Sequence, residues 1–129
     1  VLVCPEGFMQ YEDYCFLWNN NNGQGRTQMD STAYCNTLVA TLPYPIGDFH
    51  YWQKMIQDVT SDIDWDGDAW SGATLQSDEG WIWLDGTQVQ NNAWNDGEPN
   101  GNGSCSRFEG SSGILYDSVC SDTQPTLCQ

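Results

Sequence analysis

Residues 81–86 read Trp-Ile-Trp-Leu-Asp-Gly, and they set the expected fold of the second half of the chain. Side chains alternate along a strand, so Trp81 and Trp83 are predicted to lie on the same face. Asp85-Gly86 has the chemistry of a tight hairpin turn, because glycine readily adopts the positive φ angles that such turns need. The segment therefore predicts a strand over 81–84 that ends in a turn and directs its indole rings into a core.

Further strands are predicted around this segment, because short apolar stretches broken by Gly, Asp and Asn extend from Asp62 onward. The best of them is 70–75, and 114–116 and 126–129 are further candidates. At the start of the chain, the aromatic-rich segment 1–18 contains two cysteines and predicts a small hairpin closed by its own disulfide.

Two helices are predicted between these β-rich regions. Residues 27–30 have the form of a capping box, and Met29 and Ala33 follow at helical spacing. Apolar residues then recur three and four positions apart at Phe49, Trp52, Ile56 and Val59. This spacing places them on one face of a second helix, where they are expected to pack into the core. His50, the only histidine, lies off that face and is given no role. Two helices followed by mixed strands indicate an α+β fold.

Composition limits the domain number, the compartment and the partners. A chain of 129 residues has the length of one domain, so we expect a single domain over 1–129. Six cysteines without a C-x-x-C pair indicate three disulfides and an oxidising compartment, although spacing alone leaves many pairings open. No apolar run approaches the roughly 20 residues that span a bilayer, so no transmembrane segment is predicted. Because the disulfides indicate an extracellular protein, we expect that a signal peptide was removed before Val1. A net charge of -15 argues against nucleic acid and membrane surfaces as partners and favours cations.

Several motifs occur in order between the first and last cysteines. They are Cys4-Pro5-Glu6-Gly7-Phe8, Trp70-Ser71-Gly72, the 81–86 segment, Trp94 and Gly97-Glu98-Pro99-Asn100. Together they resemble the C-type lectin domains of the long form over nearly all of the chain. The resemblance implies two helices with small antiparallel sheets and a long loop for calcium and sugar. It also implies the disulfides Cys4–Cys15, Cys35–Cys128 and Cys105–Cys120, and it leaves Trp70, Trp81, Trp83 and Trp94 as core residues.

The tripeptide Glu98-Pro99-Asn100 is the predicted calcium and sugar site. Calcium takes six to eight oxygen ligands, and a carboxylate with an amide carbonyl suits it. In lectins similar to this chain the proline follows a cis peptide bond, which turns both side chains toward one point. The resemblance makes Asp117 the third ligand. It also implies that the Glu-Pro-Asn order selects the equatorial 3- and 4-hydroxyls of mannose-type sugars, whereas Gln-Pro-Asp favours galactose.

The chain departs from the family pattern at two ligand positions. Leu115 and Tyr116 replace a Trp and an Asn, and Gly103 replaces a Glu in a shortened loop. Asn102 and Ser104 are the candidates to complete the calcium shell with water. Fewer carboxylates weaken binding, so we expect a calcium affinity in the upper micromolar to millimolar range.

Aromatic side chains near this loop give a further hypothesis. Tyr116 and Phe108 are candidates to pack on a sugar, with core packing as the alternative for both. Residues 102–104 also form a glycosylation sequon, which we expect to be unoccupied if the site binds sugar. Residues 62–67 fit the opening half of a calcium loop, but Ala73 stands where such a loop has its bidentate Glu. A solvated acidic loop and an accessory calcium site are the two interpretations.

The leading functional hypothesis is a secreted, calcium-dependent lectin for mannose-type glycans, used in agglutination or innate recognition of microbes. The chain resembles small soluble lectins of invertebrates such as bivalves, which implies a non-covalent homodimer. The alternatives are a calcium-free C-type-lectin-like domain that binds protein, mineral or ice, and a calcium lectin for galactose. An enzyme is not expected, because no Ser or Cys has a plausible histidine partner.

Overall fold

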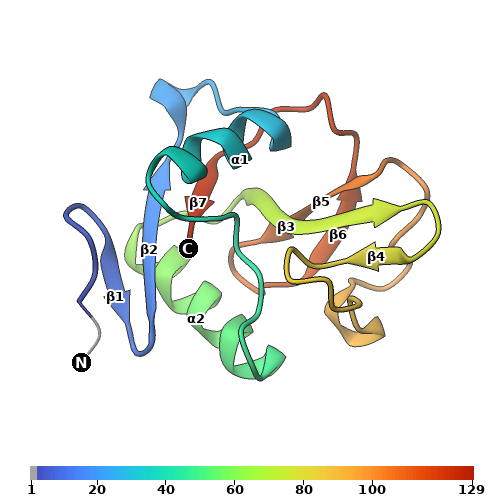
Figure 1. Ribbon diagram of the computed structural model, residues 1–129, viewed down its shortest axis with the longest axis horizontal. Helices are drawn as coiled ribbons and strands as arrows, with labels where there is room; N and C mark the ends of the chain where they lie inside the picture. The colour runs from blue at the N-terminus through green and yellow to red at the C-terminus, as the bar shows by residue number, and fades with distance from the viewer. Residues whose placement is uncertain (1–2) are drawn as a thin grey trace.

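The computed structural model describes residues 3–129, so Val1 and Leu2 of the predicted hairpin lie outside the described residues. The elements follow the chain in this order: β1 (Met9–Tyr11), β2 (Tyr14–Asn19), η1 (Asn21–Gly23), α1 (Gln28–Thr37), α2 (Phe49–Asp62), β3 (Asp68–Gln76), β4 (Gly80–Ile82), η2 (Asn91–Ala93), β5 (Cys105–Glu109), β6 (Leu115–Ser118) and β7 (Thr126–Cys128). The strands form a three-stranded sheet, β1-β2-β7, and a four-stranded sheet, β4-β3-β5-β6 (Figure 1). All strand pairs are antiparallel, which confirms the predicted α+β fold.

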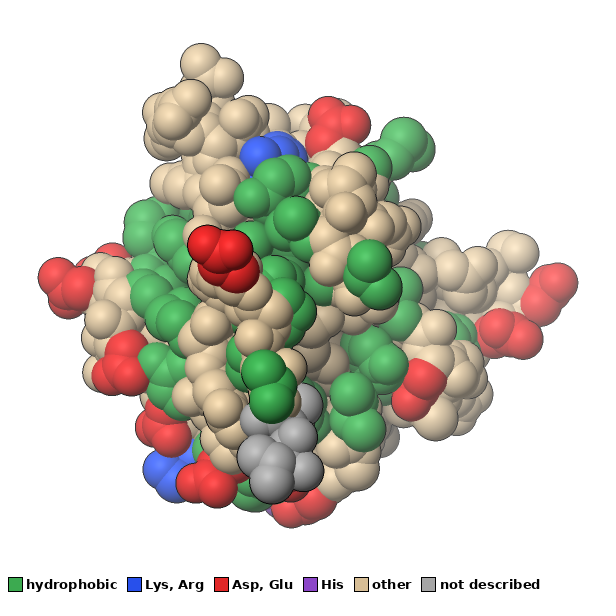
Figure 2. All heavy atoms as spheres, turned by 60° about the vertical axis from the view of Figure 1, so that its left-hand side comes forward, with side chains coloured by type: hydrophobic (Ala, Val, Ile, Leu, Met, Phe, Trp, Pro, Cys, Tyr) green, Lys and Arg blue, Asp and Glu red, His purple; other side chains and the backbone are tan. Residues whose placement is uncertain are grey.

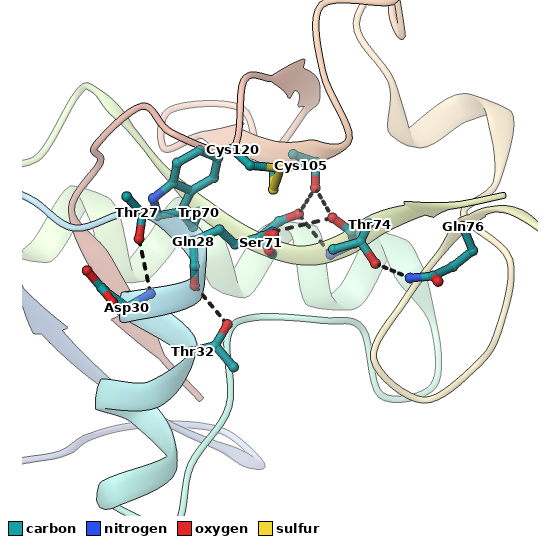
Figure 3. Close-up of a disulfide and its surroundings, with 12 residues drawn as sticks. Thr27, Gln28, Asp30, Thr32, Trp70, Ser71, Thr74, Gln76, Cys105 and Cys120 are labelled. Carbon is teal, nitrogen blue, oxygen red and sulfur yellow. Dashed lines mark hydrogen bonds between the residues drawn. A yellow bond between two sulfur atoms is a disulfide. The ribbon is translucent and has the colours of Figure 1, made fainter.

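Helix α1 begins where the sequence predicts but buries a different face. The Thr27 side chain accepts a hydrogen bond of 3.2 Å from the backbone N–H of Asp30, as a cap should (Figure 3). Met29, which contributed to the helical spacing, is 81% exposed. The buried residues are Gln28, Ser31 and Cys35. The helix packs through side-chain hydrogen bonds and a disulfide. The spacing of apolar residues cannot predict such contacts.

Helix α2 is the main apolar element of the core, as its spacing predicts. All four residues of its predicted face are buried. The indole N–H of Trp52 donates to the side chain of the C-terminal Gln129 at 2.9 Å. This bond ties the helix to the end of the chain, which continues from the last strand, β7. His50 is exposed.

The 81–86 segment forms the predicted turn after a shorter strand than expected. Strand β4 ends at Ile82, and Trp83 lies beyond it in the core with 2% exposure. Gly86 has a φ of +88°, and the Asp85 carboxylate accepts hydrogen bonds from the backbone and hydroxyl of Thr87. Trp83 is buried because its ring packs edge-to-face against Trp52 of α2.

All three disulfides implied by the family resemblance are present: Cys4–Cys15, Cys35–Cys128 and Cys105–Cys120. Cys35–Cys128 joins α1 to β7 in the core, where both residues are fully buried. Cys105–Cys120 links the start of β5 to the segment after β6, beside the first turn of α1 (Figure 3). The long segment between β4 and β5 therefore rejoins the sheet at the start of β5, which the disulfide fixes in place (Figure 1).

The surface carries the acidic excess of the sequence. Figure 2 shows Asp and Glu side chains spread over one face of the molecule, with few Lys or Arg among them. Within residues 3–129, no helix has the length and apolar character required to cross a membrane.

Candidate functional site

The candidate site is the 98–104 loop, which precedes β5 and lies against β6. The Glu98–Pro99 peptide bond is cis, as the family resemblance implies. The loop continues directly into Cys105, so its end is anchored by the sheet and by a disulfide. Asn100 and Asn102 are exposed, whereas Glu98 is half-buried.

Asp117 of β6 is the centre of the loop. Its side chain is 1% exposed, and its two carboxylate oxygens accept hydrogen bonds from three backbone N–H groups of the loop. The N–H of Asn100 donates to Oδ1 at 3.1 Å, and those of Gly101 and Asn102 donate to Oδ2 at 2.8 Å each. A buried carboxylate thus folds the loop around itself, because charge-assisted hydrogen bonds are stronger than neutral ones.

Glu98 lies beside Asp117 and is hydrogen-bonded to it. Its Oε1 accepts the backbone N–H of Asp117 at 3.3 Å. Desolvation raises the pKa of Glu98, and the hydrogen bond and negative charge of the Asp117 side chain raise it further. For Asp117 burial acts in the same direction, but the N–H of Asn100, the contact with Glu98 and the other loop amides outweigh it, so its pKa is lowered. The two carboxyl groups are close enough to share a proton or a cation.

Of the predicted ligands, the structure brings Glu98, Asn100 and Asp117 together. The side-chain oxygen of Asn100 also accepts the N–H of Asn102 at 3.1 Å, so it takes part in the loop's own hydrogen bonds. Asn102 presents an exposed side chain. Ser104 is exposed as well, but its carbonyl accepts the N–H of Leu75 in β3 at 2.9 Å and holds the loop to the sheet. The carbonyl of Ser104 is therefore already engaged, whereas Asn102 offers its side chain at the surface.

Gly103 explains why the family's carboxylate is missing there. A Cβ atom at this position would lie 2.1 Å from the backbone oxygen of Ser118. The shortened loop passes so close to β6 that any side chain would collide with backbone. The second carboxylate is thus excluded by the path of the loop itself.

The two aromatic candidates occupy different environments. Phe108 is fully buried within the main core cluster, so its proposed contact with sugar is corrected to core packing, the alternative interpretation. It points inward because it alternates in β5 with outward-facing neighbours. Tyr116 is half-buried, and its hydroxyl donates to Glu109 at 3.3 Å. Its ring is therefore held against the sheet, with one edge near the surface.

Arg107 is a member of the site that sequence reasoning missed. Its Nε donates to Asp68 at 2.5 Å, and its Nη1 donates to the backbone oxygen of Asp117 at 3.3 Å. The guanidinium carbon lies 5.1 Å from the centre of the Tyr116 ring. A signal was available, since Arg107 is one of only three basic residues in the chain and follows Cys105 by two positions.

Comparison with known proteins gives the family. Residues 24–129 match the family described as the Lectin C-type domain. The chain belongs to this family. Human lithostathine-1-beta is 28% identical to this lectin domain over 104 residues, which cover 76% of this chain and 58% of that protein. The chain thus spans less than two thirds of the relative's length.

Two solved structures illustrate how widely this fold is shared. A calcium-independent type II antifreeze protein has a TM-score of 0.78 at 23% identity, covering 99% of this chain and 94% of that chain. SPL-1 in complex with GlcNAc has a TM-score of 0.77 at 21% identity, covering 97% and 93%. At these identities the likeness establishes the C-type lectin-like fold of this domain.

A calcium ion at the carboxylates of this loop would be held by few protein oxygens. The carboxylate of half-buried Glu98 lies next to that of buried Asp117, and a bound cation would offset the repulsion between their negative charges. Three hydrogen bonds already occupy most of the lone pairs of Asp117, so the protein offers few of the six to eight oxygens that calcium takes. Within residues 3–129 no cluster of three or more acidic, histidine or cysteine side chains is placed to hold a metal.

The second acidic segment, 62–67, lies apart from this loop at the end of α2. The carboxylate of Asp62 accepts the hydroxyl of Tyr11, and Asp64 and Asp66 are exposed. Asp68, the next acidic residue, is bound to Arg107. The solvated acidic loop is therefore the interpretation that these contacts favour.

Proposed function

We propose that the chain is a secreted lectin that binds mannose-type glycans through the 98–104 loop, assisted by a weakly held calcium ion. The observation that carries the proposal is that buried Asp117 is hydrogen-bonded to both half-buried Glu98 and exposed Asn100 in a C-type lectin domain. These residues provide the half-buried carboxylate of Glu98, the exposed amide of Asn100 and the buried carboxylate of Asp117. The Asp117 carboxylate accepts the backbone N–H of Asn100, and the backbone N–H of Asp117 donates to Glu98.

The chain's own residues suit adjacent sugar hydroxyls. The Glu98 carboxylate can accept a hydroxyl hydrogen, and the side-chain NH₂ of Asn100 can donate to a hydroxyl oxygen. A bound calcium ion would accept lone pairs from the same two hydroxyls. Equatorial 3- and 4-hydroxyls occur in mannose and in GlcNAc, the sugar named in the SPL-1 complex. Galactose is the alternative sugar. Because Phe108 is buried, the partly exposed Tyr116 is the aromatic candidate that remains for packing against a sugar.

Retention on sugar columns tests the proposal. We expect the protein to be retained on mannose- or GlcNAc-agarose in millimolar calcium and released by EDTA. Glu98→Gln should abolish retention, because an amide cannot replace the carboxylate toward either hydroxyl or cation. Glu6→Gln, a matched change at an exposed site near the N-terminus, should be retained like the wild type. Retention only on galactose would change the specificity, and no retention on any sugar would refute the lectin proposal.

A second candidate function is calcium-free binding of protein, mineral or ice. The hydrogen bonds of Asp117 favour it, because the loop amides already engage the oxygens that calcium would use. The structural likeness to a calcium-independent antifreeze protein supports the same alternative. Binding that persists unchanged in EDTA would select this candidate over the first.

The assembly and setting of the lectin belong to the same proposal. We infer a single carbohydrate-recognition domain over 1–129 that acts by binding rather than catalysis. The six cysteines are paired within the chain, so a homodimer would be non-covalent. Pairing of weak sites would raise the avidity for clustered glycans, as agglutination or recognition of microbes requires.

A further inference from the structure

Arg107 is the only basic side chain at the site of a chain with 18 acidic and three basic residues. Lys54 lies exposed on α2 and pairs with Asp58 at 3.5 Å. Arg26 lies over the ring of Tyr34, with its guanidinium carbon 4.0 Å from the ring centre. The positive charge of Arg107 in β5 therefore stands alone beside the 98–104 loop and is not part of a basic surface.

Contacts from three sides hold this guanidinium in place. Asp68 receives its Nε, the backbone oxygen of Asp117 receives its Nη1, and the Tyr116 ring lies beneath it. Its side chain is 28% exposed, as is that of Asp68, so the pair is partly screened from water. A partly buried, hydrogen-bonded arginine is a fixed charge, whereas an exposed lysine moves freely.

The same strand segment receives hydrogen bonds from both directions. The carboxylate of Asp117 accepts three loop amides, while its backbone carbonyl accepts Arg107. The negative charges of Glu98 and Asp117 thus lie near a positive charge supplied by the chain itself. The polar groups that shape the 98–104 loop are consequently satisfied by protein atoms.

We propose that Arg107 is a positioning residue that keeps the 98–104 loop in its binding conformation without calcium, and that its charge weakens calcium binding at Glu98 and Asp117. The first part concerns the fold of the loop alone. The second part rests on the proposed calcium-assisted function. Calcium would then be needed only to bind the sugar, because the loop would already be ordered before calcium or sugar binds.

Hydrogen exchange of the loop tests the first part. In the wild type, the amides of residues 100–102 should be protected equally in EDTA and in millimolar calcium. Arg107→Gln should raise their exchange rate roughly tenfold in EDTA, because Asp117 loses its anchor on the carbonyl side. Lys54→Gln removes the same charge from exposed α2 and should leave these rates unchanged. Loop exchange that rises sharply when calcium is removed from the wild type would overturn the positioning role.

Calcium titration by calorimetry tests the second part. Arg107→Gln should bind calcium roughly five- to tenfold more tightly than the wild type, because a nearby like charge is removed. Arg107→Lys keeps the charge but loses the forked geometry, so it should restore the wild-type calcium affinity while leaving the loop amides exchanging faster. Lys54→Gln should stay within about twofold of the wild type, since its charge lies in the exposed solvent-screened region. Equal affinities of Arg107→Gln and Lys54→Gln would refute the electrostatic part.

A second variant guards against loss of fold. Asp68→Asn weakens the anchor of Arg107 and leaves its charge without a partner, so it should raise loop exchange less than Arg107→Gln and make calcium binding weaker than in the wild type. Circular dichroism of each variant verifies that the fold remains. Absence of sugar binding by the wild type with the predicted exchange pattern would refute the proposed function and leave the role of Arg107 standing. If the wild type loses loop protection in EDTA but still binds sugar in a calcium-dependent way, the role of Arg107 is refuted and the proposed function stands.

Discussion

Replacing both Cys35 and Cys128 with alanine is expected to lower the free energy of unfolding by about 4–5 kcal/mol. The two residues are separated by 93 positions, so their disulfide closes most of the chain into one loop. Closing a long loop removes much entropy from the unfolded state, and the stabilisation grows with loop length. Because domains of this size are stable by only about 5–15 kcal/mol, the variant should lose a large part of its stability.

Urea unfolding followed by tryptophan fluorescence measures this loss. The matched control is the double replacement of Cys4 and Cys15, which are separated by 11 positions and close only the N-terminal hairpin. The same reasoning gives it a smaller cost of about 3 kcal/mol. The buried side chains of Cys35 and Cys128 add lost packing to the difference. If the Cys4/Cys15 variant loses an equal or larger free energy of unfolding, the length of the closed loop does not determine how much each disulfide stabilises the fold.

Replacing Asp117 with asparagine is expected to lower the free energy of unfolding by about 3–5 kcal/mol and to abolish glycan binding. The carboxylate accepts N–H groups on both oxygens. An asparagine side chain has only one acceptor oxygen, so in either orientation its NH₂ group faces a backbone N–H. At least one of the three backbone N–H donors then loses its partner on Asp117, and the loop around residues 100–102 must move.

The control for this variant is Asp78→Asn, the same chemical change at an exposed residue. It should alter the free energy of unfolding by less than about 0.5 kcal/mol, as surface substitutions usually do. Urea unfolding and retention on the sugar column are measured for both variants. If Asp117→Asn unfolds within 1 kcal/mol of the control on this scale, the loop does not depend on the carboxylate as the hydrogen bonds indicate.

These two expectations separate the roles of the covalent frame and the loop. The disulfides and the aromatic core hold the fold together, while Asp117 with its neighbours shapes the 98–104 loop, the proposed binding surface. The calcium proposal concerns only that surface. A change in calcium dependence, as proposed for Arg107, can therefore occur without a change of fold.

Apolar spacing predicted the parts of the fold that are held by apolar packing. The face of α2 from Phe49 to Val59 is buried as expected, because large side chains at helical spacing have one way to leave water. Helical spacing also predicted that α1 forms, but it did not indicate which residues α1 buries, since Met29 is exposed whereas Gln28 and Ser31 are buried. Their burial depends on hydrogen-bond partners in distant strands, namely the carbonyl of Ser71 for Gln28 and the hydroxyl of Thr126 for Ser31.

The sequence by itself determined the family, through motifs and six cysteines in a fixed order, and it pointed to Glu98, Asn100 and Asp117. Only the tertiary structure placed Arg107 against Asp117, buried Phe108 and closed the space beside Gly103. Local motifs record which chemical groups are present within a few residues. Which groups meet across β5 and β6 depends on strand register and loop path, and these are set by packing of the whole chain.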